Sequence, residues 1–322
     1  MAVPAILDNM PKAPTALVRA IAQLGVEVQR GHWKPDEALL VRLGACLITL
    51  YDCLKRPLEV LRLRRRLVRW GVPLVVWNRD APGYMGKAPW RLKLLERAQL
   101  IDIYASHALA DGRRFAPLQV LLPNAVDPER YHLDGRTLEQ LRDPRGYRWD
   151  VSFFGALDGE RYKEYRARAR FFAALAARLD ALGLRYRFID TLRSPLSEAE
   201  QRRLVQQTRI NLSYGAGCEY GVSPGHGLPE RAFGIPACGG FLLSDRRLHA
   251  KDSFTPGLEW VDFEGLEDAV ERIRYFLAHF AEARAIAERA HGRVLREHTY
   301  RHRAQTLLAL VAQWRAAAQK AA

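Results

Sequence analysis

The sequence predicts an α/β protein with two Rossmann-like domains, each built on a parallel sheet. Short apolar runs alternate with helical patterns along the chain, as expected for stacked βα units. The alternation stops once, in the polar stretch 134–147. The chain has 322 residues and 48% hydrophobic content, which is enough for two separate cores. We therefore expect one domain over residues 1–140, a second over 141–300, and a last helix over 301–322 that can pack back on the first.

The first half of the chain predicts apolar strands that are each followed by a polar or glycine-bearing turn. The strands are expected at 3–7, 45–50, 73–77, 101–104 and 119–122, and the helices between them at 15–24, 57–70 and 90–99. In open parallel sheets, the loops at the carboxyl ends of the strands supply the ligand contacts. Asp80 and His107 follow predicted strands in this way, as do Asp8 and Asp52. Taken singly, each of these residues is more typical of a turn or a cap than of a catalytic base.

The second half continues the same alternation and ends in helices. Strands are expected at 149–156, 186–190, 210–214 and 241–245, and helices at 161–182, 198–207, 266–280, 283–297 and 301–314. Two α/β domains in tandem imply a cleft between them, which is the default place for a ligand.

The formal net charge of +14 favours anionic partners such as nucleotide phosphates, nucleic acid or an acidic membrane face. Basic residues concentrate in "RLRRRLVRW" at 62–70, where helical spacing separates arginines from apolar residues. This run predicts either a solvated helix face or a dock for anionic lipid headgroups or another polyanion. No RNP-type or zinc-finger pattern accompanies it, so a sequence-specific reader of nucleic acid is not expected, while looser nucleic-acid contact stays open.

Several features bear on the compartment. No window holds the roughly 18 uninterrupted apolar residues of a membrane span. The N-terminus has no basic region ahead of an apolar stretch, so we expect no signal peptide. The four cysteines form no CxxC pair, which fits a reducing compartment. The sequence predicts a cytoplasmic protein, with peripheral membrane contact as an alternative.

A glycine-rich loop, "GAGCEYGVSPGHG" at 215–227, precedes a short helical pattern. Bare backbone N–H groups at such a loop can bind an anion, which makes Gly225 and Gly227 candidates for phosphate contact. Arg231 adds a guanidinium fork that suits phosphate oxygens. The alternative is a loop with a structural role alone. Pro236 cannot donate a hydrogen bond and should kink or end the helix early.

The segment "LPERAFGIPACGGFLLSD" at 228–245 resembles the nucleotide-sugar-binding segment of GT-B glycosyltransferases. It is most similar to the CgeB-like (spore maturation protein-like) group, which reads roughly R-x-F-E-x-x-A-C-G-x-x-x-L-x-x-D there. "VLLPNAVDPERYH" (120–132), "DVSFFGA" (150–156) and "ERAHGRVLREHTYRHRAQTLL" (288–308) resemble further parts of those enzymes in the same order. The resemblance covers residues 120–310. It implies a nucleotide sugar as co-substrate, no cofactor and no metal.

Carried over by position, the resemblance assigns roles to individual residues. Gly155 would let a turn approach the donor diphosphate, and Arg161, Lys163 and Arg231 would bind it. Asn124 and Asp127 would shape the interdomain side of the cleft, although "PNAVDP" is also an ordinary turn.

One departure concerns the donor nucleoside. The family has a glutamate at the position of Gly234, where its carboxylate grips the ribose, and His226 stands at the earlier position of the Glu-x7-Glu pattern. Glu230 lies one helical turn before Gly234 and could reach the ribose instead. In the first helical turn, however, this carboxylate would lie near the phosphates and repel them.

The acceptor side has weaker signals. A base for the acceptor hydroxyl is expected at a strand end, with Asp80 and His107 as the candidates. The leading hypothesis is a metal-independent hexosyltransferase with an unidentified acceptor. The alternatives are a sugar-nucleotide epimerase or hydrolase of the same shape, and a non-catalytic nucleotide or polyanion binder that lacks the ribose glutamate.

Overall fold

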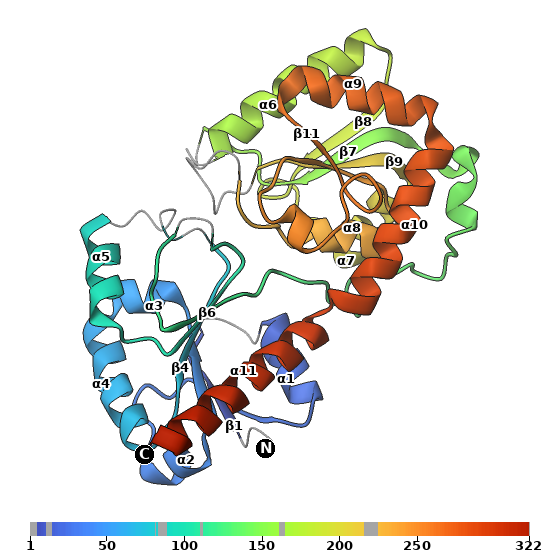
Figure 1. Ribbon diagram of the computed structural model, residues 1–322. Helices are drawn as coiled ribbons and strands as arrows, with labels where there is room; N and C mark the ends of the chain where they lie inside the picture. Colours follow the sequence, from blue (N-terminus) through green and yellow to red (C-terminus); the bar gives the residue numbers. More distant parts are fainter. Residues whose placement is uncertain are drawn as a thin grey trace. The chain divides into compact units, whose positions relative to one another are not determined.

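The computed structural model describes residues 5–10, 15–80, 82, 89–109, 112–160, 165–215 and 225–321. The chain divides into two compact units (Figure 1). The first consists of Met1–Pro123 together with Tyr300–Ala322, and the second is Asn124–Thr299. Each unit contains a parallel sheet with helices, which confirms the predicted α/β class.

The first unit has a 6-stranded parallel sheet in the order β2-β1-β3-β4-β5-β6. Its strands are β1 (Ala5–Asp8), β2 (Glu27–Arg30), β3 (Ala45–Ile48), β4 (Leu74–Asn78), β5 (Ile103–Ser106) and β6 (Leu118–Leu121). The sequence did not predict β2, because this edge strand reads "EVQR" and none of its side chains is fully buried. An edge strand needs no apolar pattern on both faces.

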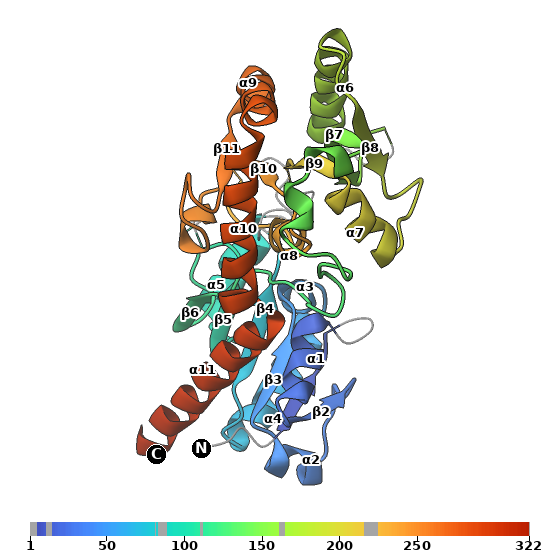
Figure 2. The same ribbon diagram turned by 90° about the vertical axis from the view of Figure 1, so that its right-hand side faces the viewer.

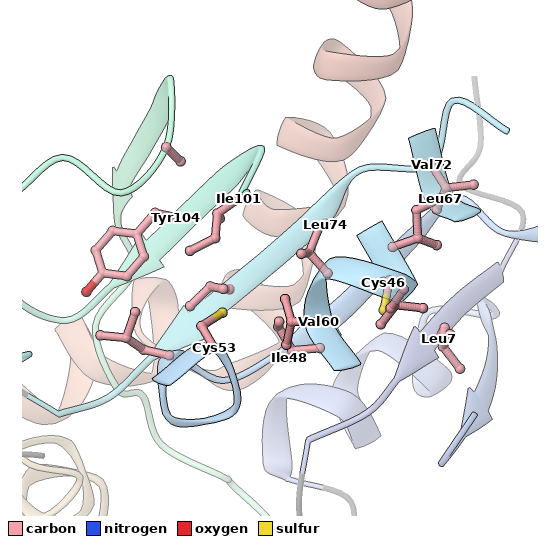
Figure 3. Close-up of a cluster of buried hydrophobic side chains, with 14 of the residues drawn as sticks. Leu7, Cys46, Ile48, Cys53, Val60, Leu67, Val72, Leu74, Ile101 and Tyr104 are labelled. Atoms are coloured by element: carbon pink, nitrogen blue, oxygen red, sulfur yellow. The ribbon is translucent and has the colours of Figure 1, made fainter. Parts of the chain in front are cut away.

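The helices of the first unit are α1 (Ala16–Gln23), α2 (Glu37–Arg42), α3 (Leu50–Lys55), α4 (Pro57–Arg69), α5 (Pro89–Ala98) and α11 (Tyr300–Ala321). Helices α3, α4 and α5 pack on a buried cluster with alternate residues of the strands. Figure 3 shows Val60 and Leu67 of α4 in this cluster with Cys46, Ile48 and Leu74. Strand alternation presents these strand residues to a single face of the sheet.

Helix α11 returns to the first unit and packs against α1 (Figure 2). Two arginines of α11 bond to backbone carbonyls of this unit: Arg303 Nε to Pro123 (3.1 Å) and Arg315 Nη1 to Leu43 (2.8 Å). Tyr300 meets Trp77 edge to face, with ring centroids 6.2 Å apart. The last helix is therefore fixed both by polar contacts to the backbone and by an aromatic contact.

The second unit has a 5-stranded parallel sheet in the order β11-β10-β9-β7-β8. Its strands are β7 (Trp149–Gly155), β8 (Tyr186–Asp190), β9 (Thr208–Ser213), β10 (Leu242–Asp245) and β11 (Val261–Phe263). Its helices are α6 (Arg166–Ala181), α7 (Glu198–Gln206), α8 (Arg231–Ala237), α9 (Gly265–Ala278) and α10 (Phe280–Glu297), with 3₁₀ turns at Gln140–Arg142, Pro144–Gly146 and Ala250–Asp252.

Helix α8 ends one residue after Pro236, as predicted. Helix α10 runs beside it and supplies hydrogen-bond donors to the carbonyls at this end (Figure 2). His291 Nδ1 bonds to the Pro236 carbonyl (3.0 Å), and Arg284 Nη1 bonds to the Gly239 carbonyl (2.8 Å). The Pro236 carbonyl thus accepts a second bond besides that from the Gly239 backbone N–H (2.8 Å), and the Gly239 carbonyl lies just beyond the end of the helix.

The predicted domain boundary at residue 140 lies inside the second unit, because the polar stretch before it packs on that unit. Gly239 makes this packing possible. Its φ is +76°, and a Cβ atom there would lie 2.6 Å from Leu141 and 2.9 Å from Leu133. Only a residue without a side chain fits both the backbone conformation and the space.

Replacing Gly239 with alanine should lower the free energy of unfolding by about 2–4 kcal/mol, measured by urea unfolding. The matched control is Gly257→Ala, where φ is +75° and nothing lies within 4 Å of an added Cβ. This control should cost only the backbone strain, about 1 kcal/mol. Equal losses in the two variants would contradict the packing role of Gly239.

Candidate functional site

The carboxyl ends of β7 and β9 are joined by one buried arginine of α6. Arg168, which is 5% exposed, donates to the carbonyls of Ala156 (3.0 Å), Tyr214 (2.9 Å) and Gly215. Ala156 follows β7, and the other two residues follow β9. Three bonds from one rigid guanidinium fix the two loops relative to each other.

A buried ion pair fixes the neighbouring strand end in the same way. Arg247, which is 4% exposed, pairs with Asp245 at the end of β10 through Nε (3.2 Å) and Nη2 (2.9 Å). Asp245 also accepts from the Gly215 backbone N–H (2.9 Å), and Arg247 Nη1 donates to the Gly227 carbonyl (3.3 Å). The glycine-bearing segment is thereby tied to β9 and β10.

Arg231, at the start of α8, lies against the end of β7. Its Nη1 donates to the Phe154 carbonyl (2.9 Å), and a Cβ atom at Gly155 would lie 2.7 Å from the same nitrogen. Glycine at 155 therefore makes room for this guanidinium. Arg231 is only partly buried, unlike Arg168 and Arg247. Of the three, it is the arginine that can contact a ligand directly.

The three guanidinium groups affect one another electrostatically. Burial, and then the positive charges of Arg168 and Arg247, lower the pKa of Arg231 to about 9. The guanidinium carbons of Arg231 and Arg168 lie 4.9 and 5.8 Å from the ring centroid of Phe153, whose electron-rich face attracts both. A bound anion would relieve the repulsion between these cations. Helix α8 has only 7 residues, so the positive charge of the site comes mainly from the arginines.

The described part of the glycine-rich segment runs beside Arg247. Gly225 and His226 accept backbone hydrogen bonds from Leu248 and His249, both at 3.0 Å, which continues the edge of the site. Both residues are partly exposed, while Gly227 is buried. Residues 216–224, and the candidates Arg161 and Lys163, lie outside the described residues.

Gly234 is covered by an aromatic ring. A Cβ atom at this position would lie 3.2 Å from Tyr131, whose hydroxyl bonds to Gln201 (3.2 Å). A side chain at 234 would require this ring to shift by a few tenths of an ångström. Glu230 is partly exposed, and its carboxylate lies 3.5 Å from Nη1 of Arg130, which itself stacks over Tyr131 at 4.9 Å. Glu230 contacts Arg130, Arg130 stacks on Tyr131, and Tyr131 packs against Gly234. Arg130 and Tyr131 precede β7, the first strand of the second unit, in the sequence.

Asn124 and Asp127 both shape backbone. The Asn124 amide is buried and donates to the Leu228 carbonyl (2.9 Å), which holds the residues just before α8. Asp127 accepts from the Glu129 backbone N–H (3.2 Å) in the turn that leads to Tyr131. Both residues therefore support the segment that covers α8.

In the first unit, Asp80 and His107 lie at the same edge of the sheet. They follow β4 and β5, whose register pairs Asn78 with Ser106. Asp80 is partly exposed, and its carbonyl accepts from the Asn78 amide. His107 is 1% exposed, and its backbone N–H donates to the Asn78 carbonyl (3.2 Å). Of these two candidates, only Asp80 has solvent-exposed surface that a substrate could contact.

Asp8 and Asp52 have structural partners. Asp8 pairs with Arg30 (2.9 Å), and Asp52 forms a capping box with Thr49 at the start of α3. The cap satisfies backbone donors that the helix itself cannot.

Sequence reasoning missed Arg168, Arg247 and Tyr131. Arg168 stands three, four and seven residues before Phe171, Phe172 and Leu175, so it falls on the apolar face of its helix. An arginine on an apolar face was a usable signal. Arg247 lies two residues after the predicted strand that ends in "LLSD" and could have been noticed near a strand end. Nothing near Tyr131 in the sequence indicates its contact with Gly234.

The fold is that of a two-unit α/β protein with three arginines gathered at the strand ends of its second unit. Residues 136–309, more than half of the chain, match the glycosyl transferase-like family, and the chain belongs to this family. No curated protein matches the sequence.

Solved structures of GT-B glycosyltransferases share the fold at low identity. Sucrose-phosphate synthase from Thermosynechococcus elongatus has a TM-score of 0.66 at 10% identity and covers 97% of this chain and 100% of its own. The Anabaena protein Alr3699/HepE in complex with UDP has a TM-score of 0.62 at 13% identity, over 96% of this chain and 100% of its own. In complex with UDP-glucose, the same protein has a TM-score of 0.59 at 11% identity, over 96% and 99%. The GT-B fold predicted from the sequence is confirmed.

The described residues contain neither a membrane-spanning helix nor a metal-binding cluster of side chains. None of the described helices is long and apolar enough to cross a membrane. No group of three or more His, Cys, Asp and Glu side chains in the described ranges is arranged to hold a metal ion.

Arg168 and Arg231 should differ in their contribution to stability. Arg168→Met leaves three carbonyls without their donor and should lower the free energy of unfolding by about 3 kcal/mol. Arg231→Met loses one such bond but removes a charge that folding disfavours, so the change should stay within about 1 kcal/mol. Urea unfolding of both variants without ligand tests this difference. If Arg231→Met costs as much as Arg168→Met, the assignment of separate roles is wrong.

Proposed function

We propose that this chain transfers a hexose from a uridine-diphosphate sugar to an acceptor, with Arg231 at the donor diphosphate. The observation that carries the proposal is the convergence of Arg168, Arg231 and Arg247 at the strand ends of the second unit. The family match includes this region. The HepE complexes with UDP and UDP-glucose support the choice of nucleotide.

The proposed mechanism is electrostatic. As the sugar leaves, negative charge grows on the diphosphate, and preorganised cations stabilise that charge without rearranging. Arg231 would touch the phosphates, with Gly155, Gly225 and Gly227 allowing the close approach. Arg161 and Lys163 are proposed as further phosphate ligands. Because guanidinium groups supply the positive charge, we propose that no metal is required.

The nucleoside side of the proposal must accommodate Gly234. Tyr131 packs tightly against Gly234, which has no side chain to reach a ribose, so we assign the ribose contact to His226 and Glu230. Glu230 is held near Arg130 at 3.5 Å, which neutralises its carboxylate and reduces repulsion of the phosphates. This arrangement answers the electrostatic objection to a carboxylate in the first turn of α8.

We propose Asp80 as the base for the acceptor hydroxyl, with His107 positioning the loop beside it. Both lie at the carboxyl edge of their sheet, where ligand groups are expected. Asn124 and Asp127 would support the donor site through the Leu228 carbonyl and the turn before Tyr131.

Two further attributes belong to the proposal. Membership of the CgeB-like group rests on the four motifs quoted from the sequence. A cytoplasmic location is supported by Cys46, Cys53 and Cys238, which are buried free thiols.

A second candidate function is a nucleotide binder without transferase activity. The glycine at 234, packed against Tyr131, favours it, because this position supplies no carboxylate to hold a ribose. An epimerase or hydrolase of GT-B shape would share the donor site and differ only in needing no acceptor. Donor consumption with and without added acceptors distinguishes these cases.

A thermal-shift screen with UDP, UDP-glucose, GDP, ADP and CDP tests the donor site. At a hundredfold excess over Kd, a specific nucleotide should add about 2.7 kcal/mol to the stability of the second unit. Arg231→Gln should weaken this shift markedly while leaving measurable binding. The matched control is Arg203→Gln, which removes one positive charge from an exposed position on α7. No shift with any nucleotide, or equal losses in both variants, would refute the proposed site.

The affinity for UDP should depend on pH through Arg231. Its pKa is about 9 in the free protein, so at pH 7–8 the side chain is charged before and after binding, and affinity should stay constant. Above about pH 9 the free protein must take up a proton to bind an anion, so affinity should fall by up to about tenfold per pH unit.

Calorimetric titration from pH 7 to 10 measures this dependence. Arg231→Gln serves as the reference, since ionisation of the nucleobase affects both proteins equally. The same slope in wild type and variant would rule out Arg231 as the titrating group.

A further inference from the structure

Helix α4 of the first unit has an exposed face rich in arginine and an opposite face that is buried and apolar. Leu58, Arg62, Arg65 and Arg69 follow one another at spacings of four and three, so they share one outward face, and all are exposed. The opposite face carries Val60, Leu63 and Leu67 into the core, where Figure 3 shows Val60 and Leu67 among the buried side chains.

The remaining arginines of this region are engaged with the protein. Arg64 pairs with Asp102 (2.7 Å), Arg66 donates to the Pro35 carbonyl (2.9 Å), and Arg56 pairs with Glu59 (3.5 Å). In contrast, no carboxylate of the described residues lies within salt-bridge distance of the three outward arginines. A charged face without internal partners is available for an external anion.

The outward face borders a basic hollow. A cavity of about 500 Å³ is lined by Trp33, Lys34, Glu59, Arg62, Arg65 and Arg66. Glu59 is already paired with Arg56, so the lining is predominantly positive. A concave basic surface can surround a phosphate group from several sides, which a flat helix face cannot.

Large apolar side chains are exposed alongside these charges. Leu58 is 66% exposed and Val68 is 55% exposed on α4. On α5, Trp90 is 60% exposed and Leu94 is 58% exposed. Helices α4 and α5 pack on the same buried cluster and follow each other along one side of the unit (Figure 1). Exposed apolar groups interleaved with arginine are typical of surfaces that enter the boundary between lipid headgroups and acyl chains.

We propose that this face of α4 and α5 binds the surface of an anionic lipid bilayer. The outward arginines and Lys34 would contact lipid phosphates, while Leu58, Trp90 and Leu94 would insert at the headgroup boundary. Aliphatic side chains gain by leaving water for a bilayer but cannot stack on bases, which favours lipid over nucleic acid. The proposal is independent of sugar transfer, because it uses none of the residues of the donor site.

Vesicle co-sedimentation tests the surface with the full chain. Vesicles of phosphatidylcholine mixed with phosphatidylglycerol should bind the protein, and vesicles of phosphatidylcholine alone should not. The combined variant Arg62→Gln, Arg65→Gln, Arg69→Gln should bind the anionic vesicles on the order of a hundredfold more weakly. Leu58→Ser with Leu94→Ser should weaken binding about tenfold at the same net charge.

A charge-matched control separates the local face from the overall charge of +14. Arg203→Gln, Arg274→Gln and Arg301→Gln remove the same number of charges from exposed positions on other helices. This control should retain most of the vesicle binding. Equal losses in both triple variants, or no binding of the wild type to anionic vesicles, would overturn the proposal. Duplex DNA that binds more tightly than anionic vesicles and competes with them would also overturn it, in favour of a nucleic-acid partner.

Discussion

The arrangement of the strand-end loops in the second unit depends on the hydrogen bonds that Arg168 makes to three backbone carbonyls. A buried guanidinium is expensive to desolvate, and it is tolerated only where its donors are used. Here they join the loops after β7 and β9, while the Asp245–Arg247 pair joins the loops after β9 and β10. Arg231 is then placed beside fixed positive charge, and its pKa falls to about 9. The same contacts that order the loops therefore prepare a site whose repulsion an anion would relieve.

The packing around position 234 gives a structural explanation for the glycine there. The position faces Tyr131, whose ring would lie 3.2 Å from a Cβ atom at 234. Tyr131 is itself held by Gln201 and Arg130, so the substitution belongs to a packed cluster rather than to an isolated loss. Glu230 belongs to the same cluster because its carboxylate forms an ion pair with Arg130. The surroundings of Gly234 thus involve residues from the 120–132 segment and from α8 together.

The positive charge of the chain is used in two physically different ways. In the second unit, arginines are buried and bonded to backbone, so their charge is fixed in place and strengthened by the low local dielectric. On α4, arginines are exposed, sensitive to salt and accompanied by apolar side chains. The first arrangement suits a small ligand with closely spaced charges. The second suits an extended anionic surface.

The sequence alone determined the α/β class, most strands and helices, and the early end of α8, because periodicity and proline are local signals. Edge strands such as β2 escaped prediction, since their side chains are not required to be apolar. Only the tertiary structure decided that residues 124–148 pack on the second unit, that Gly155 makes room for Arg231, and that Tyr131 covers Gly234. These facts depend on contacts between residues far apart in the chain, and no local pattern of residue types encodes such contacts.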